Sequence, residues 1–93
     1  MTAYVIVQCK RHLADELVRS GTASAEGKPI HRAIRAQHGT VLPSVTPATG
    51  QSTDSVFVTI EVSDFDRAGE LAATLRAMPG IEAAYPKPGE ALP

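Results

Sequence analysis

Few side chains in this sequence are suited to catalysis or metal binding, and their spacing argues against both. Cys9 and His12 form a Cys-x-x-His pair, but no second pair of cysteines or histidines completes a structural zinc site. His31 and His38 are seven residues apart, which on one helix is about 10 Å along the axis and too far for shared ligation. We therefore expect no bound metal and no cofactor.

The remaining candidates for nucleophilic or acid–base chemistry have structural explanations. Cys9 shares one side of a predicted strand with valines, which predicts a buried, inert thiol. Asp64 and Asp66 could act as paired carboxylates, but acidic residues just after Ser63 are also typical of a helix start. The stretch 21–27 lacks the Lys-Ser/Thr ending of a phosphate-binding loop. The sequence thus predicts no enzyme.

Composition narrows the class of protein further. A length of 93 residues predicts one domain, and the single cysteine excludes an internal disulfide framework. The formal net charge of −1, from nine basic and ten acidic residues, provides no basic field for a nucleic-acid backbone. The N-terminus lacks a signal peptide, and no apolar run approaches the roughly 20 residues of a membrane span. We expect a soluble cytoplasmic protein with no nucleic-acid or membrane partner, or a secreted one if a leader has been removed.

Hydrophobic periodicity predicts an alternating series of strands and helices. Strands are expected over 4–9, 40–46, 55–62 and 81–85, and helices over 11–19, from 29 to about 38, and from 64 to about 78. With right-handed crossovers this βαββαβ order predicts an α+β, ferredoxin-like fold. Its four-stranded antiparallel sheet would carry helices on one face. We expect a domain over 1–86 and an extended C-terminal tail over 87–93.

Local signals predict where these elements begin and end. Ser63 followed three residues later by Asp66 resembles a capping box, and Gly39 could close the second helix in the left-handed region. Pro43 lacks a ladder donor, so the strand over 40–46 should lie at a sheet edge. Pro86 and Pro88 favour an extended backbone in the tail.

Strand parity divides the sheet into a buried face and an open face. The predicted core is aliphatic and comprises Val5, Val7, Val56, Val58, Ile60, Leu71, Leu75 and Ile81, with Leu13 or Leu17 and Ile34. The opposite parity leaves a face free for a partner, because an antiparallel sheet can stay uncovered on one side. The residues predicted for that docking face are Tyr4, Ile6, Phe57, Thr59 and Glu61.

The motifs along the chain resemble the propeptide-type inhibitors of subtilisin-like serine proteases. The family's first strand resembles Tyr4-Val-Ile-Val7, its next strand start resembles His38-Gly-Thr-Val41, and its third strand resembles Val56-Phe-Val-Thr-Ile60. The family's second helix ends in a turn similar to Leu75-Arg-Ala-Met-Pro-Gly-Ile81, and Glu82-Ala-Ala-Tyr85 is similar to its last strand. The similarity is weak over 10–27.

This resemblance implies a protease partner. In that family the open sheet face packs on two protease helices, the C-terminal tail enters the substrate cleft, and the domain inhibits the protease or, when fused to it, acts as an intramolecular chaperone. Transferred to this chain, the resemblance predicts cleft-binding by Tyr85, Pro86, Lys87, Pro88, Gly89, Glu90, Ala91 and Leu92. An extended tail of this kind would bind by strand addition.

Two other hypotheses fit the same order of elements. One is a ligand-sensing or dimerising regulatory domain resembling ACT modules, although the loop after the first strand lacks their usual glycines. The other is a small enzyme or carrier of the dimeric α+β barrel type, which would need a reactive side chain in the barrel cavity. A homodimer is compatible with either.

Overall fold

A computed structural model of the chain describes residues 2–19, 27–47 and 55–88, without the side chains of 44–47. In chain order the elements are β1 (Ala3–Lys10), α1 (Arg11–Arg19), α2 (Gly27–Ala36), β2 (Thr40–Pro47), β3 (Ser55–Val62), α3 (Phe65–Arg76) and β4 (Ile81–Pro88). Within these ranges no helix combines the length and apolar character needed to cross a membrane.

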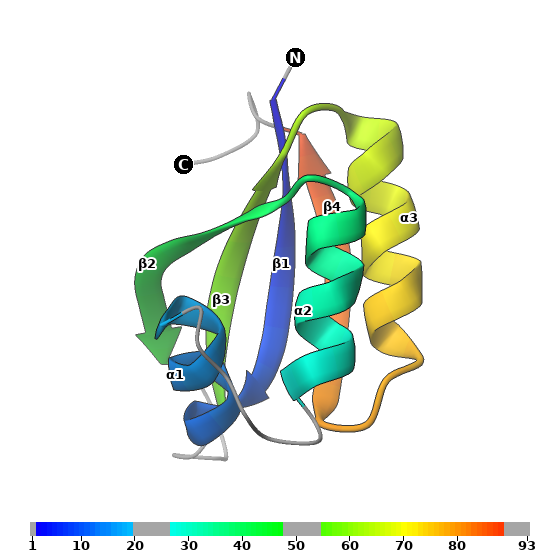
Figure 1. Cartoon of the computed structure of the whole chain (residues 1–93). Helices are drawn as coiled ribbons and strands as arrows, with labels where there is room; N and C mark the ends of the chain where they lie inside the picture. Colours follow the sequence, from blue (N-terminus) through cyan, green and yellow to red (C-terminus); the bar gives the residue numbers. More distant parts are fainter. Residues whose placement is uncertain (1, 20–26, 48–54, 89–93) are drawn as a thin grey trace.

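The four strands form one antiparallel sheet in the order β2-β3-β1-β4, with three helices in front of it in Figure 1. Strands β1 and β3 are central because each carries apolar residues able to pack on both faces. The α+β, ferredoxin-like arrangement predicted from the sequence is thereby confirmed. Figure 1 also shows α1 beside β2 and β3, whereas α2 and α3 lie over β1 and β4.

The core lies between the helices and one face of the sheet. Alternate residues of β1 and β3 are fully buried there, and the helices contribute one apolar stripe each. The predicted core is confirmed except at Ile81, which is only partly buried and packs against the cluster. The largest buried side chains are aliphatic: Leu13, Leu17, Ile30, Ile60, Leu71 and Leu75, with the valines of β1 and β3.

Helix α2 ends in a left-handed turn at a residue different from the predicted one. His38, not Gly39, adopts the positive φ of 56°, so the prediction for Gly39 is wrong. The His38 amide donates to the Arg35 carbonyl over 3.0 Å, and the Gly39 amide donates to the Ile34 carbonyl over 2.8 Å. These two bonds are those of a Schellman motif. His38 therefore lies beyond the helix and does not share a helix face with His31.

Helix α3 begins one residue later than predicted. Asp64 is the N-cap, and its carboxylate accepts a hydrogen bond from the Arg67 amide over 2.8 Å. The predicted Ser63–Asp66 capping box is not formed, although Asp66 does lie in the first turn, where an acidic residue is favoured. Asp64, and not Ser63, is the N-cap because its carboxylate reaches a free amide in the first turn of the helix.

Both outer strands contain proline. Strand β2 is an edge strand as predicted, and its pairing with β3 is irregular between Val41 and Val45, around Pro43. Strand β4 is the other edge and continues to Pro88, three residues beyond the predicted end. Because β4 has one neighbour, Pro86 and Pro88 fit the ladder with their nitrogens directed away from β1, where no donor is needed.

Candidate functional site: the open face of the sheet

The sheet face opposite the helices carries an ordered array of side chains. Residues paired across antiparallel strands lie on the same face. The registers of β3 and β4 against β1 therefore give three rows: Glu61–Tyr4–Lys87, Thr59–Ile6–Tyr85 and Phe57–Gln8–Ala83. All five residues predicted for the docking face belong to these rows.

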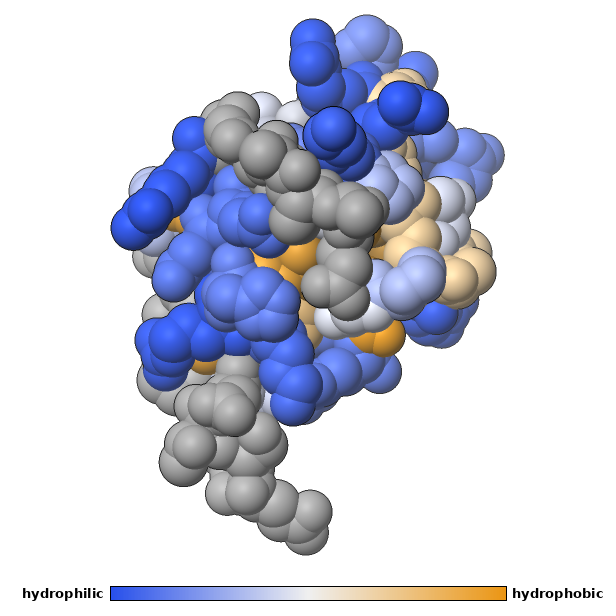
Figure 2. Space-filling view, turned by 60° about the horizontal axis from the view of Figure 1, so that its bottom comes forward, coloured by the Kyte–Doolittle hydropathy of each residue, from blue (hydrophilic) through white to orange (hydrophobic). Residues whose placement is uncertain are grey.

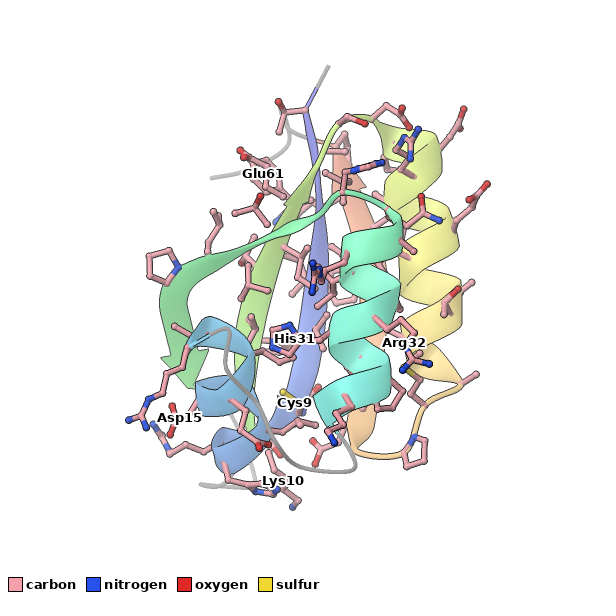
Figure 3. All side chains as sticks on the ribbon, viewed as in Figure 1. Cys9, Lys10, Asp15, His31, Arg32 and Glu61 are labelled. Atoms are coloured by element: carbon pink, nitrogen blue, oxygen red, sulfur yellow. The ribbon has the colours of Figure 1, made fainter. Side chains whose placement is uncertain are left out.

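The open face is partly apolar and accessible. Tyr85 is 44% exposed, and the other members of the three rows are half-buried. An antiparallel sheet can leave one face to solvent or to a partner, and the three rows form such a face. Figure 3 shows Glu61 near one end of the sheet and Lys10 at the other, so charged residues flank the apolar centre.

A β-bulge in β4 shapes the end of the face near Lys10. Gln8 pairs with Ala83 and Cys9 with Ile81, which leaves Glu82 as the extra residue. The Glu82 carboxylate accepts hydrogen bonds from the Ser55 hydroxyl at 2.6 Å and from the Gln8 amide at 3.3 Å. It also lies 3.6 Å from the Lys10 ammonium group.

This cluster uses the polar groups at that end of the sheet for internal contacts. Ser55 is 2% exposed, so its hydrogen bond to Glu82 satisfies a buried hydroxyl. Viewed from this end, the surface is mostly hydrophilic and apolar residues show only in small patches (Figure 2). On the open face itself, the registers place the apolar side chains in the three rows.

The predicted tail residues divide into two groups. Tyr85, Pro86, Lys87 and Pro88 are part of β4 and pair with β1 along its whole length, so they belong to the sheet. Tyr85 and Lys87 point to the open face, because they pair with Ile6 and Tyr4. Gly89, Glu90, Ala91 and Leu92 lie outside the described residues.

The side chains first considered for chemistry are not brought together. Cys9 is fully buried beneath the helices, as predicted, and burial together with the nearby Glu82 carboxylate raises its pKa to about 11. A thiol in this environment is a poor nucleophile. His12 is exposed on α1, whereas Cys9 is fully buried. In the described ranges, no three histidine, cysteine or acidic side chains are arranged to hold a metal ion.

Comparison with solved structures identifies a similar fold in another protein. The solution structure of the C-terminal domain of the MgtC protein from Mycobacterium tuberculosis matches with a TM-score of 0.58. The two sequences are 22% identical, and the match covers 97% of this chain and 88% of that one. At this identity the likeness establishes a shared fold. No protein-family model matches the sequence, and no curated protein matches it.

This finding corrects the resemblance to protease propeptides. The fold match is to a domain of MgtC, so the predicted protease partner, the inhibition and the intramolecular chaperone activity are wrong. The motifs that suggested them have structural roles: Tyr4-Val-Ile-Val7 lies in a central strand, and Pro79-Gly80 is the turn between α3 and β4. Any ferredoxin-like chain needs such elements. The likeness does not favour an ACT module either.

Proposed function

We propose that this chain is a non-enzymatic association domain that forms a homodimer through the open face of its sheet. The observation that supports the proposal most strongly is the row Glu61–Tyr4–Lys87. Glu61 and Lys87 pair with the same residue of β1 from opposite sides, and within the described part of the chain neither side chain forms an ion pair or a hydrogen bond. One strand beside β1 thus carries a negative charge and the other a positive charge at the same level, so two copies of the face can match each other's charges.

A two-fold axis that runs parallel to β1, above the open face, would bring these charges opposite one another in a dimer. Rotation about that axis brings the β3 side of one sheet over the β4 side of the other and keeps each row level with itself. Glu61 of each copy then lies opposite Lys87 of the other, which gives two ion pairs per dimer. Such a closed, isologous contact is the commonest kind of homodimer interface.

The other two rows are complementary in size under the same rotation. Tyr85 falls opposite Thr59 of the second copy, and Phe57 falls opposite Ala83, so each aromatic ring meets a smaller side chain. Ile6 meets its own counterpart near the axis. Two sheets packed face to face are about 10 Å apart and interdigitate their side chains in this manner.

The size of the face sets the expected affinity. Four strands of eight residues, at about 4.8 Å between strands and 3.3 Å per residue, cover roughly 500 Å² per copy, or about 1,000 Å² for the pair. Specific interfaces usually bury about 1,200–2,000 Å² in total, so this one would be slightly smaller than that range. We expect a dimer with a dissociation constant in the micromolar range.

Sedimentation-velocity centrifugation over a wide concentration range tests the proposal. Glu61→Lys and Lys87→Glu should each weaken dimerisation at least tenfold, because each places like charges opposite one another twice per dimer. The double variant Glu61→Lys/Lys87→Glu should recover most of the affinity, since it restores opposite charges. Circular dichroism should show that all three variants remain folded.

A matched control separates this interface from a general effect of charge. Glu70 lies exposed on α3, on the helix-covered side, so Glu70→Lys should leave the dissociation constant unchanged. A chain that stays monomeric at several hundred micromolar contradicts the proposal. So does a folded double variant that dimerises no better than the single ones.

A further inference from the structure

A cavity on the helix side of the molecule combines features of a ligand-binding site. It lies between α2 and the start of β2 and has a volume of about 670 Å³. Helix α2 contributes Lys28, His31, Arg32, Ile34 and Arg35, and the following segment contributes Gly39, Thr40 and Val41. Cavities of roughly 300–1,000 Å³ are the size that holds small-molecule ligands. This cavity is separate from the open sheet face.

The lining is strongly basic. Lys28, Arg32 and Arg35 are three of the nine basic residues of the chain, and none of the described residues that line the cavity is acidic. Spacings of three and four residues place them on neighbouring turns of one side of α2. No carboxylate in the described part of the chain forms an ion pair with them. In a protein of net charge −1 this is a local concentration of positive charge.

A buried imidazole nitrogen in the lining lacks a partner. Among the side chains that the structure describes, Nε2 of His31 is the one buried nitrogen or oxygen without a hydrogen bond. Buried polar atoms of this kind usually have a partner, and an exception calls for an explanation such as a ligand. In Figure 3 His31 points from α2 toward α1, and Arg32 points away from α1.

The C-terminal end of α2 should not repel an anion bound in this cavity. Helix C-termini carry partial negative charge on their free carbonyl groups. Here the carbonyls of Ile34 and Arg35 accept hydrogen bonds from the amides of Gly39 and His38. Arg35, which is exposed and lines the cavity, therefore does not face free carbonyl groups of Ile34 and of its own residue.

We propose that this cavity binds a small phosphorylated molecule, with its phosphate group between Arg35, Lys28 and His31. Guanidinium groups bind phosphate through paired hydrogen bonds, and lysine contributes a point charge. The aliphatic side chains of Ile34 and Val41 would contact an apolar part of the ligand. Arg32, one turn after Lys28 on the same side of α2, completes the basic rim.

The probe for a first test is inorganic pyrophosphate, added to ¹⁵N-labelled protein at constant ionic strength. The amide signals of Arg35, Gly39 and Thr40 should shift saturably, and Nε2 of His31 should shift in a long-range ¹H–¹⁵N spectrum as it gains a partner. Chloride at matched ionic strength should produce neither change. Pyrophosphate that gives only linear shifts, equal to those with chloride, overturns the proposal.

Charge-neutralising variants locate the site. Lys28→Gln/Arg35→Gln changes two exposed side chains, so it should fold normally and weaken pyrophosphate binding at least tenfold. Arg19→Gln/Arg76→Gln removes the same charge from α1 and α3 and should retain the wild-type affinity. Equal weakening in both pairs would mean that the protein attracts anions by overall charge only, and the cavity would not be the site. The result is independent of whether the chain dimerises.

Discussion

His38 and Gly39 show at the scale of single residues how two different constraints act on neighbouring positions. His38 has the positive φ at the end of α2, a conformation that a histidine adopts at some cost. Gly39 has no such φ but is closely packed. A Cβ atom there would lie 3.0 Å from Cγ2 of Ile60 and 3.1 Å from Cγ2 of Ile34. The glycine is needed for close approach, not for backbone freedom.

Gly39→Ala should therefore destabilise the protein by about 1–3 kcal/mol, the usual range for overpacking a core. The added methyl group would also lie 3.3 Å from the Ile34 carbonyl oxygen, which cannot move without loosening the end of α2. Urea denaturation followed by circular dichroism measures the change. His38→Gly is the matched variant and should stabilise the chain by up to about 1 kcal/mol, because it relieves the left-handed strain. If Gly39→Ala stabilised the protein and His38→Gly destabilised it, the conformational constraint would lie at Gly39 and this interpretation would be wrong.

The buried thiol of Cys9 gives stability a defined pH dependence. Its pKa is 9.0 in an unfolded chain and about 11 in the folded one, because burial and the Glu82 carboxylate disfavour the thiolate. Between these values the unfolded chain binds fewer protons than the folded chain, so the free energy of unfolding falls as pH rises. A difference of about two pK units corresponds to a loss on the order of 2–3 kcal/mol by pH 11.

Denaturation curves between pH 8 and 11 measure this loss, with Cys9→Ala as the control. The alanine variant is less stable at pH 8 but should lose less stability on going to pH 11. Other groups titrate in this range, and the difference between the two proteins removes their contribution. Parallel pH profiles would show that Cys9 does not carry the effect.

At the scale of elements, the start of α3 shows what sequence patterns can and cannot decide. Ser63 and Asp64 are both good N-cap residues, and the sequence alone ranks them about equally. The structure selects Asp64, whose carboxylate reaches the Arg67 amide. Which of the two residues caps the helix depends on the direction in which the chain leaves β3. Local residue propensities do not predict that direction.

Alanine substitution at these two positions tests the assignment. Asp64→Ala should cost about 0.5–2 kcal/mol, since it leaves a helix amide without its acceptor. Ser63→Ala should change the free energy of unfolding by less than about 0.5 kcal/mol, because Ser63 is exposed and outside the cap. Both values come from urea denaturation at neutral pH. A larger loss for Ser63→Ala would restore the capping box as the start of the helix.

Strand β4 was the element least accessible to sequence reasoning. Alternation and strand propensity predicted β1, β3 and the parity of the open face, because those strands consist of β-branched residues. Pro86 and Pro88 read as a tail, since proline is rare inside a sheet. Only the sheet order places them at an edge, where they are tolerated, and moves Tyr85 and Lys87 onto the open face. The basic spacing of Lys28, Arg32 and Arg35 was visible in the sequence, but the cavity beside it depends on how α2 packs near β2.

On the scale of the whole molecule, the two faces of the sheet contribute to two different free energies, that of folding and that of association. Its helix-covered face holds the aliphatic core and determines whether one copy folds, whereas its open face is proposed to determine whether two copies associate. A chain of 93 residues has an expected stability of about 5–14 kcal/mol. Because side chains of opposite parity do not touch one another through the sheet, changes on the two faces should act independently.

Leu75→Ala and Tyr85→Ser test this separation. Leu75 is fully buried, so its truncation should lower the free energy of unfolding by about 2–5 kcal/mol while leaving the dimer dissociation constant within about twofold of wild type. Tyr85 is 44% exposed, so Tyr85→Ser should weaken dimerisation at least tenfold but change the stability of the monomer by less than about 1 kcal/mol. Urea denaturation at nanomolar protein concentration measures the free energy of unfolding of the monomer. Sedimentation velocity at 10 °C measures the dissociation constant of the dimer. If Leu75→Ala weakened association as strongly as Tyr85→Ser, the helix side would be part of the interface and the two-fold axis along β1 would be wrong.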